Sequence, residues 1–468
     1  MGPFFERSGI VRRFIGDKAF YRRLLTVMLP IVIQQGITNF VNLLDNIMVG
    51  QVGTEQMSGV AITNQLLFIF QLCIFGILSG AGIFCAQYYG KGDKEKFQSA
   101  VRYKVISVSL ITVLGIVVFY VFREPLIRLF LTDSGSGGDL EATLHYGEQY
   151  LKVMLIGLVP FAIVQLYSST MRETGETAIP MVATMAALFG NMALNYVLIF
   201  GHFGAPKLGV AGAAIATTIS RFMELTIILL AAHRNKQKFP YFVGLYRTLR
   251  VPLSLAKEVT IKGTPLMLNV FLWSLGNTMV VQGYSQRGLD AVAAYNISST
   301  VANFFSMAVF SMGTAISILV GQELGTGDFD RAVDTNRKMI FAGVILCAGA
   351  AVLLSIAAPY FPLIYNTTDE IRSAATKLLL LDALFLVPRG LYNNSYFTLR
   401  SGGKTLITFL FDSCSLWLVN LPVAFLLARL TGLSLVQMYL VVQLVDSLKA
   451  ILGLYLVNKR TWVNNLAD

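Results

Sequence analysis

The sequence has 468 residues, of which 55% are hydrophobic and 13% are charged, and its formal net charge at pH 7 is +11. A soluble protein of this length carries about a quarter charged residues, so the composition excludes an ordinary soluble fold. The positive charge would suit a nucleic-acid-binding protein, but its distribution along the chain, described below, argues against that class.

The apolar residues lie in twelve long blocks separated by charged breaks or by breaks rich in glycine and proline. Each block is long enough to cross about 30 Å of hydrocarbon as a helix. A helix suits lipid because all its backbone hydrogen bonds form within the segment. In chain order the predicted spans are residues 24–49, 57–88, 99–122, 143–168, 177–200, 208–232, 258–285, 291–320, 337–358, 372–397, 405–428 and 434–457. The sequence therefore predicts an all-α integral membrane protein with twelve transmembrane helices.

Four cysteines, Cys73, Cys85, Cys347 and Cys414, all lie within apolar blocks and show no CxxC spacing. This pattern favours buried thiols over disulfides or a metal site. The apolar stretch that follows the basic first twenty-three residues is too long for the core of a cleavable signal peptide, so we expect no leader.

Lysine and arginine are distributed unevenly between the two sets of loops. When both termini are placed in the cytoplasm, 26 of the 37 basic residues fall in inside segments and 6 fall in outside segments. Cytoplasmic loops of membrane proteins carry such an excess. We therefore expect a multi-pass protein of the cell membrane with both termini in the cytoplasm, the lipid bilayer as its environment, and no nucleic-acid partner.

The chain also contains an internal repeat. A shift of 235 residues places Pro30 on Pro265 and Gln87 on Gln322, and a shift of 228 residues aligns the fourth and fifth spans with the tenth and eleventh. Six spans separate the copies, so both copies insert in the same direction, as in transporters with parallel repeats. This predicts two pseudo-symmetric six-helix lobes in a V-shaped bundle. The predicted parts are an N-terminal lobe at 1–233, a cytoplasmic linker at 234–257 and a C-terminal lobe at 258–468.

Several motifs resemble those of the multidrug and toxic compound extrusion (MATE) family. They include NIMVG at 46–50, QYYGKGD at 87–93, RETGET at 172–177, GNMALNYVLIFG at 190–201, LGVAGAAIAT at 208–217 and GQELGTGD at 321–328. The resemblance implies a secondary active antiporter, not an enzyme, that uses no cofactor. It further implies export of amphipathic organic compounds, cationic or zwitterionic, by alternating access driven by Na⁺ or H⁺.

Polar residues inside the predicted spans are the candidates for function, because burying them in lipid is costly. Asp45, Asn191, Asn195 and Thr217 are predicted at similar depth, and the i, i+4 spacing of the asparagines places both on one helix face. This oxygen-rich set suits Na⁺, or a proton held on the carboxylate. The resemblance assigns the family's first-lobe cation site to residues that match Asp45, Asn191 and Asn195. The alternative is an interhelical hydrogen-bond network, and the choice between sodium and proton stays open.

A second set of polar residues lies in the other half of the chain. Asp382 and Arg389 share a face of the tenth span, where they either line a substrate cavity, together with Trp273 and Asp412, or neutralise one another and their neighbours. One branch of the family carries acids at the positions of Trp273 and Arg389, so we expect no second-lobe cation site of that kind. Arg389 in a cavity would suit anionic or zwitterionic substrates.

Prolines and charged pairs complete the candidates. Pro30 and Pro265 each remove a backbone hydrogen bond, so they either fix packing or allow the helices to bend during transport. The i, i+3 pairs Arg221/Glu224 and Asp446/Lys449 are interpreted as structural ion pairs.

Two other functions are compatible with a polytopic membrane protein. A flippase for a lipid-linked precursor is the main alternative, although few lysines and arginines fall within the spans. A membrane enzyme or receptor is more remote, since the chain has no HExxH motif, no phosphate-binding glycine loop and no soluble domain. The short outer loops favour a monomer.

Overall fold

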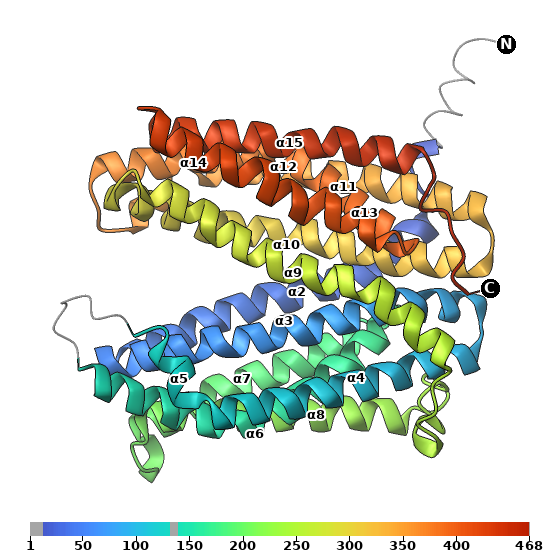
Figure 1. Ribbon diagram of the computed structural model, residues 1–468, viewed down its shortest axis with the longest axis horizontal. Helices are drawn as coiled ribbons and strands as arrows, with labels where there is room; N and C mark the ends of the chain where they lie inside the picture. The colour runs from blue at the N-terminus through green and yellow to red at the C-terminus, as the bar shows by residue number, and fades with distance from the viewer. Residues whose placement is uncertain (1–12, 132–138, 468) are drawn as a thin grey trace. The chain divides into compact units, whose positions relative to one another are not determined.

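The computed structural model describes residues 13–131 and 139–467, and every regular element in these ranges is a helix (Figure 1). The first twelve residues, which include Arg7 and Arg12 of the predicted basic N-terminus, lie outside the described part. The longer helices are α2 (Lys18–Gly50), α3 (Thr54–Lys91), α4 (Lys94–Val121), α6 (Leu140–Glu173), α7 (Ala178–Phe200), α8 (Gly209–Arg234), α9 (Leu253–Ser285), α10 (Leu289–Thr326), α11 (Phe329–Ala357), α12 (Asp369–Ser401) and α15 (Leu435–Asn458). Short helices are α5 (Arg123–Arg128), η1 (His202–Gly204), η2 (Leu245–Arg247) and η3 (Phe361–Ile364).

Within the described residues, eleven helical segments are long and apolar enough to cross a membrane. The long helix that does not meet this hydropathy criterion is α12, which has 33 residues and covers the predicted span 372–397. Its lower hydropathy has a direct cause, because Asp382, Arg389 and a pair of asparagines lie in its middle. With α12 included, each of the twelve predicted spans corresponds to a helical segment, and the all-α membrane fold is confirmed.

The eleventh span is helical throughout but changes its winding. It consists of α13 (Thr405–Phe409), the π-helical segments η4 (Leu410–Cys414) and η5 (Leu416–Asn420), and α14 (Leu421–Leu430). In a π-helix the backbone bonds run from residue i to i+5, and such turns are found frequently at functional sites. The second of these segments, η5, supplies side chains to the pocket described below.

The chain folds into two compact units that do not follow the sequence halves strictly. One unit consists of residues up to Val32, Ala86–Asp93 and Thr260 onward, and the other consists of Ile33–Cys85 and Lys94–Val259. The division within α2 falls between Val32 and Ile33, two residues after Pro30. The lobe boundaries given by the sequence repeat stay predictions.

Each unit is organised around one or two central helices. In the unit that holds most of the C-terminal half, α12 packs extensively against α10, α11 and α15. In the other unit, α8 packs extensively against both α6 and α7. The polar residues of α12 and α8 are therefore held inside these units, where neighbouring helices can supply hydrogen-bond partners.

Two repeat-related glycines allow the ends of α3 and α10 to touch. A Cβ added at Gly90 would overlap the backbone carbonyl of Gln322, and one added at Gly325 would overlap the backbone carbonyl of Gln87. The Gln87 side chain also donates to the backbone carbonyl of Ser401 at 2.9 Å. The close approach is reciprocal, so the repeat seen in the sequence is reproduced as a paired backbone contact inside one unit.

Candidate functional site

The first candidate site is a polar cluster in the unit that contains most of the N-terminal half. Asp45 projects from α2, Asn191 and Asn195 from α7, and Thr217 from α8, so the structure brings the four predicted residues together. Asn195 Nδ2 donates to Asp45 Oδ1 at 2.8 Å and lies 3.2 Å from the Asn191 side chain, which in turn lies 3.3 Å from Thr217 Oγ1. Both asparagines are buried. The cluster joins three helices around one carboxylate.

The Asn191 amide presents its nitrogen to Asp45 and its oxygen to Thr217. The nitrogen lies 3.2 and 3.0 Å from the two carboxylate oxygens of Asp45, while the oxygen faces the Thr217 backbone N–H and hydroxyl. In this orientation the nitrogen donates to an ionised carboxylate and the oxygen accepts from Thr217. With the oxygen toward Asp45 two acceptors would oppose one another, so hydrogen bonding favours the nitrogen at this position.

A buried acceptor in the same cluster has no partner. Asn195 Oδ1 is screened from solvent and receives no hydrogen bond within the described structure. Such an unsatisfied atom costs free energy and calls for an explanation such as an absent ion or water. The atoms in the cluster that could bind a metal ion are carboxylate, amide and hydroxyl oxygens, which suit a hard cation such as Na⁺. Among the described residues there is no group of three or more His, Cys, Asp or Glu that could hold a metal ion.

Further polar residues continue along α8 from the cluster. Arg221 and Glu224 follow Thr217 at i+4 and i+7, and so lie on the same face of the helix. Arg221 Nη1 donates to the Gly157 carbonyl at 3.1 Å, and Glu224 Oε1 accepts from Thr184 Oγ1 at 2.6 Å. Within the described residues these two side chains are thus bonded to separate partners, and the direct ion pair expected from their spacing is not formed.

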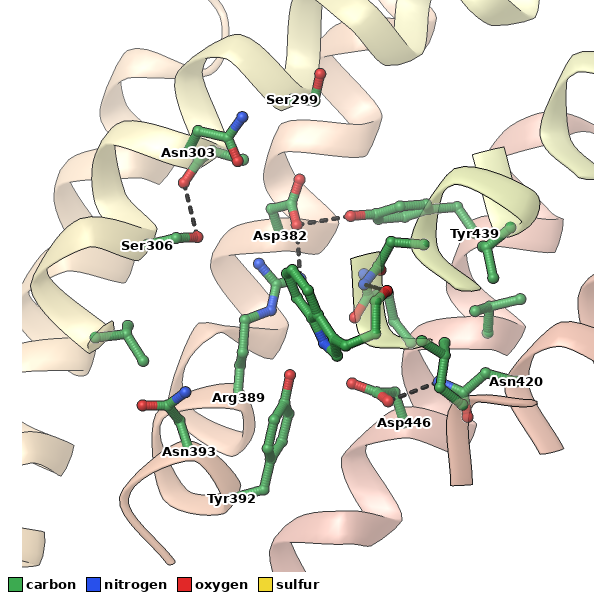
Figure 2. A pocket seen from close by; sticks show the side chains of 18 of the residues that line it. Ser299, Asn303, Ser306, Asp382, Arg389, Tyr392, Asn393, Asn420, Tyr439 and Asp446 are labelled. Carbon is green, nitrogen blue, oxygen red and sulfur yellow. Dashed lines mark hydrogen bonds and ion pairs between the residues drawn. The ribbon is translucent and has the colours of Figure 1, made fainter. Parts of the chain in front are cut away.

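The second candidate site is a pocket inside the other unit, formed by α9, α10, α12, α15 and the π-helical segment η5 (Figure 2). Its volume is about 220 Å³. The side chains that line it are mostly polar: Trp273, Asn277, Tyr284, Tyr295, Ser298, Ser299, Asn303, Ser306, Asp382, Arg389, Tyr392, Asn393, Asn420, Tyr439, Gln443, Asp446 and Lys449, with Val280, Ala302, Val309, Phe310, Leu416 and Val442. Its size is below that of a typical drug-binding cavity.

The charges in this pocket neutralise one another in two ion pairs. Arg389 Nη2 lies 2.9 Å from Asp382 Oδ1, which also accepts a hydrogen bond from the Tyr439 hydroxyl at 2.7 Å (Figure 2). Asp446 Oδ1 accepts from Lys449 Nζ at 2.7 Å and from Asn420 Nδ2, so the second pair is held from two helices. The pocket therefore offers both signs of charge without a net excess of either.

Three of the four residues predicted to line a cavity, Trp273, Asp382 and Arg389, lie at this pocket. Asp412 does not line it, and instead accepts a hydrogen bond from Asn269 of α9 at 3.0 Å. The sequence interpretation of Asp446 and Lys449 as an ion pair agrees with the structure but missed that both line the pocket. The four tyrosines had no signal in the sequence, because aromatic residues are common throughout these helices.

Comparison with known proteins gives a consistent result. A family model described as MatE matches residues 30–197 and 265–426. The "Probable multidrug resistance protein YoeA" of Bacillus subtilis is 26% identical over 424 residues, covering 90% of this chain and 89% of that protein. The "Probable multidrug resistance protein NorM" of Thermotoga maritima is 28% identical over 423 residues, covering 88% of this chain and 87% of its own length.

Solved structures agree on the fold. A crystal structure of a MATE protein in complex with MaD3S superposes with a TM-score of 0.84 at 17% identity, covering 96% of this chain and 97% of that chain. A mutant of the Vibrio cholerae MATE transporter VcmN gives a TM-score of 0.85 at 18% identity, covering 96% and 98% of the two chains. At these identities the likeness concerns the fold alone.

Proposed function

Since the chain belongs to the MatE family, and is therefore a membrane transporter and not an enzyme, we propose that it is a secondary active antiporter for small organic compounds. In this proposal Na⁺ or H⁺ moves inward while substrate moves outward across the cell membrane. Both termini face the cytoplasm, and the protein works as a monomer. Multidrug efflux is the activity indicated by the names of its relatives.

The observation that carries the coupling proposal is the cluster around Asp45. Asp45 is the only acid among its four members, and its carboxylate accepts hydrogen bonds from the amide nitrogens of Asn191 and Asn195. With Asp45 ionised and empty, both nitrogens donate to it. When Na⁺ or a proton binds at Asp45, these hydrogen bonds to the carboxylate weaken, and the unsatisfied Asn195 Oδ1 is available as a further ligand. Cation binding thus rearranges contacts between α2, α7 and α8.

Such a rearrangement drives transport only if the cation binds the two conformations with different affinity. The boundary between the two compact units within α2 lies two residues after Pro30. Proline has no backbone N–H, so one hydrogen bond of the helix is missing there. We propose that α2 bends at Pro30, and α9 at Pro265, when the cation binds. Bending of α2 would move Asp45 relative to α7 and so change the affinity of the cluster.

The pocket in the other unit is the proposed substrate site. Arg389 and Lys449 can receive an anionic group, while Asp382 and Asp446 can receive a cationic group. Trp273 and the tyrosines supply aromatic faces that attract organic cations. Because its charges are balanced, the pocket suits a zwitterion or a compact cation. Asp412 contributes from outside the lining by holding Asn269 of α9 in place.

The test is transport by purified protein in liposomes under separately imposed sodium and pH gradients, with a fluorescent organic cation and a fluorescent zwitterion as probes. We expect one gradient to drive transport, and Asp45→Asn to abolish it while substrate binding in the absence of a gradient persists. Asp369→Asn is the matched control, since its side chain is 96% exposed and its change in charge is identical. Normal gradient-driven transport by Asp45→Asn would overturn the proposal.

A further inference from the structure

A second cavity lies where α11 begins and α15 ends, within the unit that contains both helices. Its volume is about 450 Å³, and it shares no lining residue with the polar pocket. The residues that line it are Phe14, Val333, Asn336, Arg337, Ile340, Phe341, Val344, Leu454, Val457, Asn458, Arg460 and Trp462. Neither the transport cycle nor the coupling cluster makes use of this cavity.

The polar residues of the lining gather toward one end of the cavity, beside the apolar Val333 and Val457. On α11, Arg337 precedes Val344 by two helical turns, or about 10 Å. On α15, Leu454 precedes Asn458 and Arg460, so the polar residues of both helices gather at the same end. The apolar end continues onto outward faces of both helices, where large side chains are exposed: Val352, Leu353 and Ile356 on α11, and Leu448, Ile451 and Leu452 on α15. A ligand that fills the cavity must therefore have a polar head and an apolar chain.

The polar end carries positive charge that the described protein does not compensate. None of the described residues lining the cavity is acidic, and within the described structure neither Arg337 nor Arg460 forms an ion pair. The nearby acid Asp334, one turn before Lys338 on α11, is bonded to that lysine. Two guanidinium groups beside an apolar wall form an anion-binding arrangement, because arginine recognises phosphate through paired hydrogen bonds.

The backbone at Arg460 is also held in an unusual conformation. Its φ is 54°, in the left-handed region that residues other than glycine rarely adopt. Neighbouring contacts maintain it: the Trp462 indole is 1% exposed and donates to the Val457 carbonyl at 3.0 Å. Strained residues of this kind persist where the surroundings fix them, and they concentrate at ligand sites. The conformation presents Arg460 at the rim of the cavity.

We propose that this cavity binds one anionic phospholipid, whose phosphate lies between Arg337 and Arg460 and whose acyl chain follows the apolar faces of α11 and α15. In the proposed orientation the site opens to the inner leaflet, where basic pockets between helices attract anionic lipids. Trp462 and Phe14 lie at the level of the headgroup, the position that aromatic residues favour in membranes. The inference depends on membrane insertion and on this orientation, and is independent of the coupling ion and of the exported compound.

The first experiment is native mass spectrometry of the purified full chain in detergent with added phosphatidylglycerol or phosphatidylcholine. We expect one phosphatidylglycerol per chain to be retained in preference to phosphatidylcholine. Arg337→Gln and Arg460→Gln should each weaken this retention about fivefold, since one basic residue near a membrane surface contributes about 1 kcal/mol. Arg429→Gln, an equal loss of charge at an exposed position of α14, is the control and should retain the lipid as wild type does.

The second experiment locates the lipid on the unaltered protein. Phosphatidylglycerol with a photoreactive acyl chain should label peptides of α11 and α15, and millimolar inorganic phosphate should not displace it. The proposal would be overturned by equal retention of the two lipids, or by unchanged retention when Arg337→Gln and Arg460→Gln are combined. Labelling of other helices, or displacement by inorganic phosphate, would also overturn it. The labelling arm remains decisive if a variant fails to fold.

Discussion

A buried ion pair in the unit formed mostly by the N-terminal half gives the sharpest stability prediction. Lys104 of α4 is fully buried, and its Nζ contacts the Glu173 carboxylate at the end of α6 at 2.5 Å and the Ser169 hydroxyl at 3.2 Å. The Glu173 side chain is 11% exposed. We predict that Glu173→Gln strongly destabilises the protein because it leaves the lysine charge buried without a counter-charge.

The magnitude follows from the geometry. At an effective dielectric constant of about 20, charges 2.5 Å apart attract by roughly 6–7 kcal/mol, and the cost of removing both from water offsets much of this. Removing one partner of a buried pair costs about 3–5 kcal/mol, whereas replacing both by uncharged residues is close to neutral. The double variant Lys104→Met with Glu173→Gln should therefore lie within about 1 kcal/mol of wild type.

The assay is a double-mutant cycle on melting temperature in detergent at a fixed heating rate, since membrane proteins commonly unfold irreversibly. For a folding unit of about 200 residues, a loss of about 4 kcal/mol lowers the melting temperature by roughly 10 °C. We expect this decrease for Glu173→Gln and recovery of most of it in the double variant. A single variant that melts as wild type does, or a double variant no better than Glu173→Gln, would show that the buried lysine does not depend on this counter-charge.

Three further predictions concern the close helix contact and the two candidate sites. Gly325→Ala should destabilise the protein by about 1–3 kcal/mol, because the added Cβ overlaps a backbone carbonyl. Gly349→Ala, which has open space around it, is the control, and equal melting temperatures of the two variants would contradict this prediction. Asn195→Asp places a second carboxylate beside Asp45, so the midpoint of the pH dependence of transport should rise by about one unit or more, and an unchanged profile would argue against a shared cation site. Arg389→Met removes the partner of Asp382, so liposome transport should shift from a zwitterionic probe toward a cationic one, and loss of both to the same degree would indicate a structural role.

The sequence predicted the helices well because their signal is long and strong. Twelve apolar blocks, the repeat and the four residues of the Asp45 cluster were all identified from residue type and spacing, and the structure brings that cluster together. The tenth span was predicted from its apolar block even though its helix, α12, is too polar to meet a hydropathy criterion.

What sequence reasoning could not give is the choice of partners across helices. Spacing suggested that Arg221 and Glu224 pair with one another, but each finds a partner on another helix, because i, i+3 spacing permits a contact without requiring it. Asp412 was likewise expected to line the cavity, but in the structure it accepts a hydrogen bond from Asn269 instead. Which neighbour a polar side chain contacts depends on the rotation of its helix about the helix axis. A segment that is hydrophobic on all sides carries no pattern from which this rotation can be predicted.

The π-helical winding of the eleventh span shows how that rotation can be adjusted within a single helix. Seven residues make almost two full turns of an α-helix, so Ser413 and Asn420 would project from the same side if the span were regular. Bonds from i to i+5 rotate each residue through a smaller angle, and the two side chains diverge: Ser413 bonds to Asn269 of α9, while Asn420 bonds to Asp446 of α15. The polar residues of one span can thus form hydrogen bonds with two neighbouring helices. Without the π-helical winding the two side chains would project from the same side, and Asp446 would keep Lys449 as a partner but lose Asn420.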